Sequence, residues 1–368
     1  MGLSLRPATG PTCLRPAPRG AEPSLVRQKL NQNSLVPGLI ARRPEVGAVW
    51  CSGLRPSDNG DCVLELFYFR HPAGNFGDDL NAWIWDALLP GWNSWTTAAT
   101  LIGVGTILNT ELPLPEGRKL VVGSGTGYGR IPDVSDRAQW DLRALRGPLS
   151  AERLGVPRDI GIVDPAMMLP RLPEFADIPR SGTQPLFVPH LSGATRHDWP
   201  RVCRRAGLRY VSPCGEARAV IEEIARAPLV LAESLHAAII ADAFRTPWIA
   251  VSVSNLINRD KWADWAASLG IALEFHELFP EFTRLRRALR PTPAPAGTAP
   301  AAAPGAPPRS RARRAKLALR LRAERPLIAR RLRKAATASP TLSDPATLRQ
   351  RQESYQAVLD GVIRDYRG

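Results

Sequence analysis

The sequence predicts an α/β protein built from two Rossmann-like domains, with a disordered N-terminal extension and a basic C-terminal extension. From residue 62 onward, short β-type apolar runs alternate with amphipathic helical segments, which is typical of parallel sheets covered by helices. The chain has 368 residues, of which 44% are hydrophobic, so it is long enough to bury two cores of ordinary size. Residues 165–185 are rich in Pro, without periodicity and with several turn signals, and we place the boundary between the two domains there.

Each domain has its own series of elements. In the first, we expect strands over residues 63–70, 120–123 and 160–163, and a helix over residues 79–89 that Pro90 and Gly91 end. In the second, we expect strands over residues 186–189, 208–211, 229–232 and 248–253, with helices over residues 199–206, 215–227, 235–244 and 259–269. Ligands of such sheets bind beyond the carboxyl ends of the strands, so the segments that follow strands are expected to carry the site.

These elements divide the chain into four parts. Residues 1–60 are rich in Pro, Arg and Gly, and they are either disordered or an overlong translation start. Residues 61–170 and 171–283 form the two Rossmann-like domains. Residues 284–368 form a basic tail rich in Pro, Ala and Arg, in which residues 348–366 have the pattern of a short amphipathic helix.

The net charge of +15 resides in this tail. Between residues 284 and 334 lie 16 of the 49 Lys and Arg and one of the 34 acidic residues, which leaves 33 basic and 33 acidic residues elsewhere. The body of the protein is therefore neutral, which argues against a nucleic-acid-binding core.

The five cysteines form no Cys-x-x-Cys pair, and their odd number indicates neither a zinc ribbon nor a disulfide framework. We expect no metal site. The chain has neither an apolar run long enough to span a membrane nor the apolar stretch of a signal peptide. The cytoplasm is the simplest compartment for such a protein.

The most informative motif is Ser-Leu-His at residues 234–236, between the strand over 229–232 and the next helix. Ser234 is a suitable N-cap, which puts His236 in the first helical turn, where N–H groups and the helix dipole favour an anion. The dipole lowers the pKa of an unliganded imidazole and a bound phosphate dianion raises it, so His236 is a candidate proton donor to a phosphorylated substrate. A local hydrogen bond at the helix start is the alternative explanation.

Residues 75–81 place small and polar side chains at a predicted strand-to-helix turn. Gly77 lets the backbone approach a ligand, and Asp78 is either a helix N-cap or a functional carboxylate. Asn75 and Asp79 have no such ready structural explanation and are better candidates for ligand contacts.

A glycine-rich loop, residues 123–127, suggests a phosphate cradle in which Ser124, Gly125 and Thr126 contact the ligand. A tight turn between packed layers is the alternative. No Gly-x-Gly-x-x-Gly pattern occurs here, so NAD binding is disfavoured, and we expect no cofactor.

His190 follows the predicted strand over residues 186–189 and is a second candidate acid or base, or else a surface histidine. Trp262 and Trp265 lie three residues apart on one helical face. Trp262 is therefore a candidate sugar-stacking residue, although core packing is the commoner role of such a pair.

The motif at residues 234–236 resembles the signature of the polysaccharide pyruvyl transferases. Five further segments carry the same resemblance in order, at residues 75–81, 101–107, 121–127, 146–150 and 164–166. Together they resemble the branch that places pyruvate ketals on bacterial exopolysaccharides. The resemblance implies a two-lobed glycosyltransferase-B-like architecture with the active site in the cleft.

The resemblance also implies an activity: transfer of an enolpyruvyl-derived group from phosphoenolpyruvate to two hydroxyls of one sugar, with release of phosphate. The acceptor would be an exopolysaccharide or its lipid-linked precursor. His236 would act near the phosphate as acid or electrostatic catalyst, and Asp78, Asp79 or His190 as base. Many relatives have an Arg where this chain has Ser234, so another cation must neutralise the donor. Arg146 is the first candidate for that anion clamp and Arg143 the second.

Two other functions remain open at this stage. A glycosyltransferase with a nucleotide-sugar donor would share the two-lobed fold and a phosphate site at a helix N-terminus. A non-catalytic binder of nucleic acid or anionic surfaces would act through the tail. Within the tail, residues 309–334 set leucines among arginines. If they form a helix, it would contact anionic lipid headgroups at the inner face of the membrane, whereas a disordered tail without a dedicated partner is the alternative.

Overall fold

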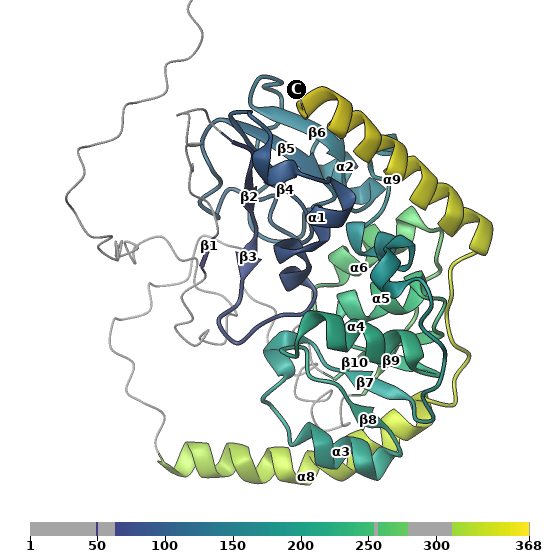
Figure 1. Cartoon of the computed structure of the whole chain (residues 1–368). Helices are drawn as coiled ribbons and strands as arrows, with labels where there is room; N and C mark the ends of the chain where they lie inside the picture. Colours follow the sequence, from purple (N-terminus) through teal and green to yellow (C-terminus); the bar gives the residue numbers. More distant parts are fainter. Residues whose placement is uncertain (1–48, 51–62, 254–256, 279–310, 368) are drawn as a thin grey trace, which may run out of the picture. The chain divides into compact units, whose positions relative to one another are not determined.

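The computed structural model describes residues 49–50, 63–253, 257–278 and 311–367 (Figure 1). The predicted N-terminal extension therefore lies outside the described residues, except for the strand β1 (Val49–Trp50), which pairs antiparallel with β3 (Phe69–Arg70). The Pro/Ala spacer after residue 290 also lies outside them. None of the described helices combines the length and apolar character needed to cross a bilayer.

The first sheet is parallel and has the strand order β2-β4-β5-β6. Its two central strands, β4 and β5, are buried on both faces, as expected for a parallel sheet covered by helices. Its elements are β2 (Glu65–Phe67), η1 (Asp78–Ala82), α1 (Ile84–Leu88), η2 (Trp92–Ser94), β4 (Ala99–Ile102), β5 (Arg118–Val122), β6 (Trp140–Ala144), α2 (Pro148–Arg153), η3 (Arg158–Ile160), η4 (Pro165–Arg171) and η5 (Pro173–Phe175).

The second sheet is also parallel and has the strand order β11-β10-β9-β7-β8. Its elements are β7 (Leu186–Val188), η6 (Leu191–Gly193), α3 (Trp199–Ala206), β8 (Arg209–Tyr210), α4 (Ala217–Arg226), β9 (Val230–Ala232), α5 (Leu235–Ala243), β10 (Trp248–Ser252), α6 (Arg259–Ser268) and β11 (Phe275–Glu277). The α/β class with two parallel sheets is thus confirmed.

Parts of the first sheet differ from the prediction. No strand forms over residues 160–163, because the chain enters η3 and only Gly161 pairs, in a single bridge with Leu145. The strands β4 and β6 were not predicted. The predicted domain boundary falls in the short helical turns η4 and η5, which separate the last strand of the first sheet from β7, and its position remains a prediction.

Two C-terminal helices belong to the folded body. The first, α8 (Arg311–Ala335), packs against α3, and its Ile328 and Leu332 are fully buried in the core of the second sheet. In an amphipathic helix on a membrane surface, these two apolar side chains would face the lipid. Here they face the protein core. Side chains of residues 311–321 lie outside the described ones.

The last helix, α9 (Pro345–Tyr366), confirms the helix predicted near the C-terminus and packs on the first sheet (Figure 1). The buried Tyr355 hydroxyl donates to the carbonyl of Val122 on β5 at 2.5 Å, and the Gln352 amide donates to the carbonyl of Met167 at 2.7 Å. Between the two helices, Thr341 bridges Trp248 on β10. The segment from α8 to α9 thus contacts both sheets.

Candidate active site

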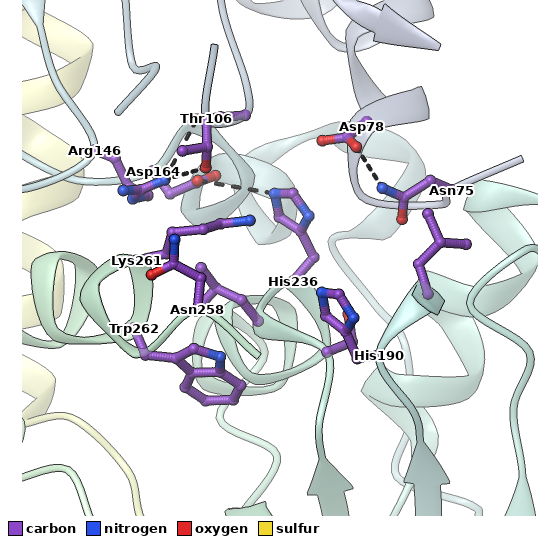
Figure 2. A pocket seen from close by; sticks show the side chains of 14 residues that line it. Asn75, Asp78, Thr106, Arg146, Asp164, His190, His236, Asn258, Lys261 and Trp262 are labelled. Atoms are coloured by element: carbon purple, nitrogen blue, oxygen red, sulfur yellow. Dashed lines mark hydrogen bonds and ion pairs between the residues drawn. The ribbon is translucent and has the colours of Figure 1, made fainter. Parts of the chain in front are cut away.

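A pocket lies where segments that follow strands of both sheets meet (Figure 2). Gly105 and Thr106 follow β4, Arg146 follows β6, and His190 follows β7. The lining also includes residues after β3, β9 and β10. It comprises Asn75, Asp78, Gly105, Thr106, Arg146, Asp164, His190, Leu191, Ser234, Leu235, His236, Asn258, Lys261 and Trp262. This position matches the expectation that ligands bind beyond the carboxyl ends of parallel strands.

His236 lies in the first turn of α5, as predicted, and its imidazole faces the pocket (Figure 2). Ser234 occupies the N-cap position but makes no side-chain capping hydrogen bond. Burial, together with the nearby charges of Lys261 and Arg146, lowers the pKa of His236 to about 3. The imidazole is therefore neutral at physiological pH when the pocket holds no anion.

Gly77 has a different role from the predicted approach to a ligand. A Cβ at this position would overlap the His236 ring, well under 3.0 Å from Nδ1. Because Gly77 has no side chain, the imidazole packs directly against the backbone that precedes η1. The 75–81 segment therefore positions His236.

Asp164 faces His236 from the start of η4, and the sequence analysis did not select it as a site residue. Its Oδ1 accepts a hydrogen bond from the Ala166 amide at 3.0 Å. Its Oδ2 is buried without a hydrogen-bond partner and lies 4.0 Å from Nε2 of His236. Burial raises the pKa of Asp164 to about 6. A completely buried carboxyl with an unpartnered oxygen in a pocket is typical of a functional group.

The carboxylates of the 75–81 segment have distinct surroundings. Asp78 lines the pocket, accepts a hydrogen bond from the Asn75 side chain and has a pKa raised to about 6 by burial. It is not an N-cap, since Gly77 occupies that position and Asp78 is the first residue of η1. Asp79 instead accepts from the backbone amide of Asn75 at 2.8 Å and is not among the lining residues. Asn75 and Asp78 thus line the pocket, whereas Asp79 forms a hydrogen bond within its own turn.

Arg146 is buried at the pocket wall, and each of its N–H groups has a partner. Its Nε and Nη2 bind Asp264 Oδ2 at 3.1 and 2.8 Å, and Nη2 also donates to the Thr126 carbonyl at 2.8 Å. Its Nη1 donates to Thr106 Oγ1 at 2.7 Å and to the Gly105 carbonyl at 3.4 Å. An anion could bind this guanidinium only by displacing one of these protein acceptors.

The loop at residues 123–127 supports Arg146 and does not line the pocket. Gly125 lies against the guanidinium, and a Cβ there would approach its Cζ to 2.5 Å. Ser124 donates to the carbonyl of Gly105 at 3.3 Å, and the Thr126 amide donates to the Ser150 hydroxyl at 2.9 Å. The tight-turn alternative therefore describes this loop better than a phosphate cradle.

Arg143 does not reach the pocket. It lies on β6, where its guanidinium binds Asp141 at 2.6 Å and Asp365 of α9 at 2.7 Å. Its side chain therefore connects the first sheet to the last helix.

His190 and Trp262 both line the pocket. The Nδ1 of His190 lies 2.7 Å from the Ser192 hydroxyl, and burial together with the charge of Lys261 lowers the pKa of His190 to about 4. Trp262 is 2% exposed and packs among Trp248, Trp265 and Phe275, so most of its indole belongs to the core.

Thr106, Asn258 and Lys261 are pocket residues that the sequence analysis did not select. Asn258 is the N-cap of α6, and Lys261 is three residues further along the same helix. The charge of Lys261 acts on the pKa values of Asp78, Asp164, His190 and His236. Lys261 could have been found from its place in the first turn of the helix that follows β10.

Comparison with known proteins places the chain in a family. Residues 136–255 match the sequence profile described as polysaccharide pyruvyl transferase. The chain is 42% identical over 317 residues to the succinoglycan biosynthesis protein ExoV of Rhizobium meliloti (strain 1021), an alignment that covers 82% of this chain and 100% of that protein. No solved structure matches the chain significantly. Because the identity extends over most of both sequences, the chain belongs to the polysaccharide pyruvyl transferase family, a family of transferases.

Proposed function

We propose that this enzyme transfers pyruvate from phosphoenolpyruvate to two hydroxyls of one sugar, forming a cyclic ketal in an exopolysaccharide or its lipid-linked precursor. The observation that carries the proposal is the pocket itself. It brings a neutral histidine in the first turn of a helix, two buried carboxyls and a lysine together between two parallel sheets. The likeness to a succinoglycan biosynthesis protein supports an exopolysaccharide acceptor.

The reaction needs one acid and one base in balance. Protonation of the donor's methylene carbon makes the methyl group and leaves an oxocarbenium-like centre at C2, to which the first hydroxyl adds. The bond from C2 to the phosphate oxygen then breaks, and the second hydroxyl adds in its place. The two hydroxyl protons balance the proton taken up by the carbon and the one that departs on hydrogen phosphate.

His236 and Asp164 together fit the acid. The N-terminus of α5 favours a phosphate dianion beside His236, and that negative charge would raise the pKa of the imidazole from its low value in the empty pocket. Asp164 retains a proton on a fraction of molecules near neutral pH because its pKa is about 6. The two groups lie 4.0 Å apart, close enough to share one proton in the presence of the donor.

Asp78 is the best base for the attacking hydroxyl among the predicted residues, and His190 is the second. Asp78 lines the pocket, is ionised above its pKa of about 6, and has a single side-chain partner in Asn75. His190 is neutral over the physiological pH range and can accept a proton. Asp79 is a weaker candidate because it binds the backbone of its own turn. This scheme requires no metal and no cofactor.

The test is phosphate release from phosphoenolpyruvate with oligosaccharide acceptors, for the native chain and His236→Ala. Acceptor-dependent release that is lost in the variant would support both the reaction and the site. Nucleoside diphosphate release from a nucleotide sugar, without phosphate release from phosphoenolpyruvate, would overturn the proposal in favour of glycosyl transfer.

We place the enzyme in the cytoplasm, in peripheral contact with the inner face of the membrane through the basic surface formed by α3 and α8. These helices expose Arg201, Arg204, Arg205, Arg322, Arg330 and Arg333, and their described side chains include no exposed acid. Leu327 is 42% exposed among these arginines. A cationic surface with a protruding apolar side chain fits anionic lipid headgroups.

Sedimentation with vesicles of anionic phospholipid tests this contact. The combined substitution of Arg204, Arg322 and Arg330 by Gln should lower the bound fraction. The matched control replaces Arg130, Arg137 and Arg171, which are exposed outside α3 and α8. Equal binding of the two variants would contradict the assignment of this surface.

A further inference from the structure

Lys261 differs from the other cation on the pocket wall in the number of its partners. Among the lining residues, Arg146 and Lys261 are the arginine and the lysine. Every N–H of Arg146 is engaged by Asp264, Thr106 or a backbone carbonyl. The ammonium of Lys261 donates to the Tyr128 hydroxyl at 3.3 Å, and no carboxylate of the described residues forms an ion pair with it. An ammonium has three donors, so Lys261 can bind an anion without breaking a protein ion pair.

The position of Lys261 is fixed by contacts between the two halves of the pocket. Its side chain passes Gly127, where an added Cβ would approach its Cγ to 2.7 Å. Three residues earlier, the Asn258 side chain donates to the carbonyl of Gly127. Three residues later, Asp264 binds Arg146 and the amide of Ser150. The first turns of α6 are therefore held against the first sheet's loops, and the lysine stem has little freedom to move.

The ammonium of Lys261 points toward His236 and Asp164 (Figure 2). An anion bound between Lys261 and the N-terminus of α5 would therefore lie beside the imidazole. Ser234 lies on the same wall and carries no charge. The cation on this side of the pocket that has no carboxylate partner among the described residues is Lys261 of α6.

We propose that Lys261 binds the phosphate of the donor and neutralises it as it departs. The inference rests on the proposed function, because it identifies the donor phosphate as the ligand of Lys261. The ammonium stabilises negative charge that develops on the leaving oxygen, which is the usual task of a lysine in phosphate chemistry.

The first test compares kinetics of Lys261→Met, Lys261→Arg and Arg171→Met, the last an exposed cation on η4. Loss of one charged contact should raise the KM for phosphoenolpyruvate or lower kcat/KM by about 10- to 100-fold in Lys261→Met. The KM for the acceptor should stay within about twofold of the native value, and Lys261→Arg should retain most of the activity. Donor kinetics in Lys261→Met that equal those of Arg171→Met would overturn the proposal.

The second test moves the charge. In the double variant Lys261→Met, Ser234→Arg, the new guanidinium enters the same pocket from the N-cap of α5, and it should restore at least a part of the lost kcat/KM for the donor. A lysine with a purely structural role would not be replaced by a cation on another helix. Failure of this rescue, with native folding verified by circular dichroism, would count against an electrostatic role.

The third test separates this proposal from the proposed reaction. Calorimetry with inorganic phosphate should show binding to the native chain and to Arg171→Met, and at least tenfold weaker binding to Lys261→Met. If phosphate binds in this manner but phosphoenolpyruvate is not turned over, the phosphate site stands and the proposed donor is wrong. If phosphoenolpyruvate is turned over and phosphate binding does not depend on Lys261, the reaction stands and the role of Lys261 is wrong.

Discussion

The imidazole of His236 occupies the space that a side chain at Gly77 would need. These residues are 159 positions apart in the sequence: Gly77 directly precedes η1, and His236 lies in the first turn of α5. The imidazole of His236, the proposed acid, can lie in this position because Gly77 has no side chain. The lack of a side chain at position 77 therefore leaves the space that the imidazole of His236 occupies.

Gly77→Ala should lower kcat strongly, because the new Cβ displaces the imidazole from its place beside Asp164. Overpacking of this kind should also lower the free energy of unfolding by about 1–3 kcal/mol. The measurements are phosphate release and urea unfolding. Gly361→Ala in α9 is the control, since a Cβ there meets only an ordinary contact at 3.5 Å and the fold should be as stable or more stable. Native turnover in Gly77→Ala would show that the ring has room to move.

Asp164→Asn should stabilise the protein at high pH. Burial raises the folded-state pKa from 3.8 to about 6, so the folded form binds this proton more tightly than the unfolded form, and native stability falls as pH rises through that interval. Asparagine cannot ionise, so the variant should gain up to about 3 kcal/mol above pH 7, and the gain should vanish near pH 4. Its kcat should decrease.

Urea unfolding of Asp164→Asn between pH 4 and 8 measures this difference. The control is Asp133→Asn, because the Ser135 amide lowers the pKa of the exposed Asp133 and no gain at high pH is expected there. If the free energy of unfolding of Asp164→Asn differed from that of the native protein by the same amount at every pH, the pKa of Asp164 would not be raised in the native state.

Arg146→Met should destabilise the protein by about 3–5 kcal/mol, because Asp264 would remain as a buried charge without its partner. The matched control is Arg153→Met. Its ion pair with Asp260 also reaches α6, from the end of α2, but is exposed to solvent and should contribute less than about 1 kcal/mol. Equal effects of the two substitutions on unfolding would contradict a supporting role for the buried pair.

Tyr355→Phe should lower the free energy of unfolding by about 1 kcal/mol, since it removes the buried hydrogen bond from α9 to the Val122 carbonyl. Tyr366→Phe removes a hydroxyl that binds Asp141 and Arg118 in a partly exposed position, so its effect should be smaller. Thermal unfolding of both variants checks the order. A larger loss of stability in Tyr366→Phe than in Tyr355→Phe would mean that α9 is held mainly by its C-terminal residue.

The sequence predicted the second sheet better than the first, for a physical reason. Its helices are regular and well delimited: α3 has the predicted bounds, with an Asp198 N-cap and Gly207 in a left-handed conformation at its end. The strands of the first sheet are instead linked largely by short 3-10 turns. The strand β4 follows a Thr-rich segment without a turn signal, and Ile160 belongs to a turn, although its apolar neighbours suggested a strand.

In the site, sequence patterns identified the segments, and the structure determined which side chains face the pocket. His236, His190, Asn75 and Asp78 are brought together as the strand-end argument required. Arg143 was misjudged because its neighbour in the sequence, Asp141, and a distant helix bind it. The unpartnered oxygen of Asp164 depends on tertiary burial, which no local pattern reveals.

The last helix has a consequence for the order in which the protein is made. The strand β5 is synthesised early. The Val122 carbonyl on this strand accepts its hydrogen bond from the hydroxyl of Tyr355, which is synthesised much later. Domains generally fold as units from the N-terminus during synthesis. The first sheet of this enzyme therefore lacks its α9 layer until residues 345–366 have been synthesised, long after β5.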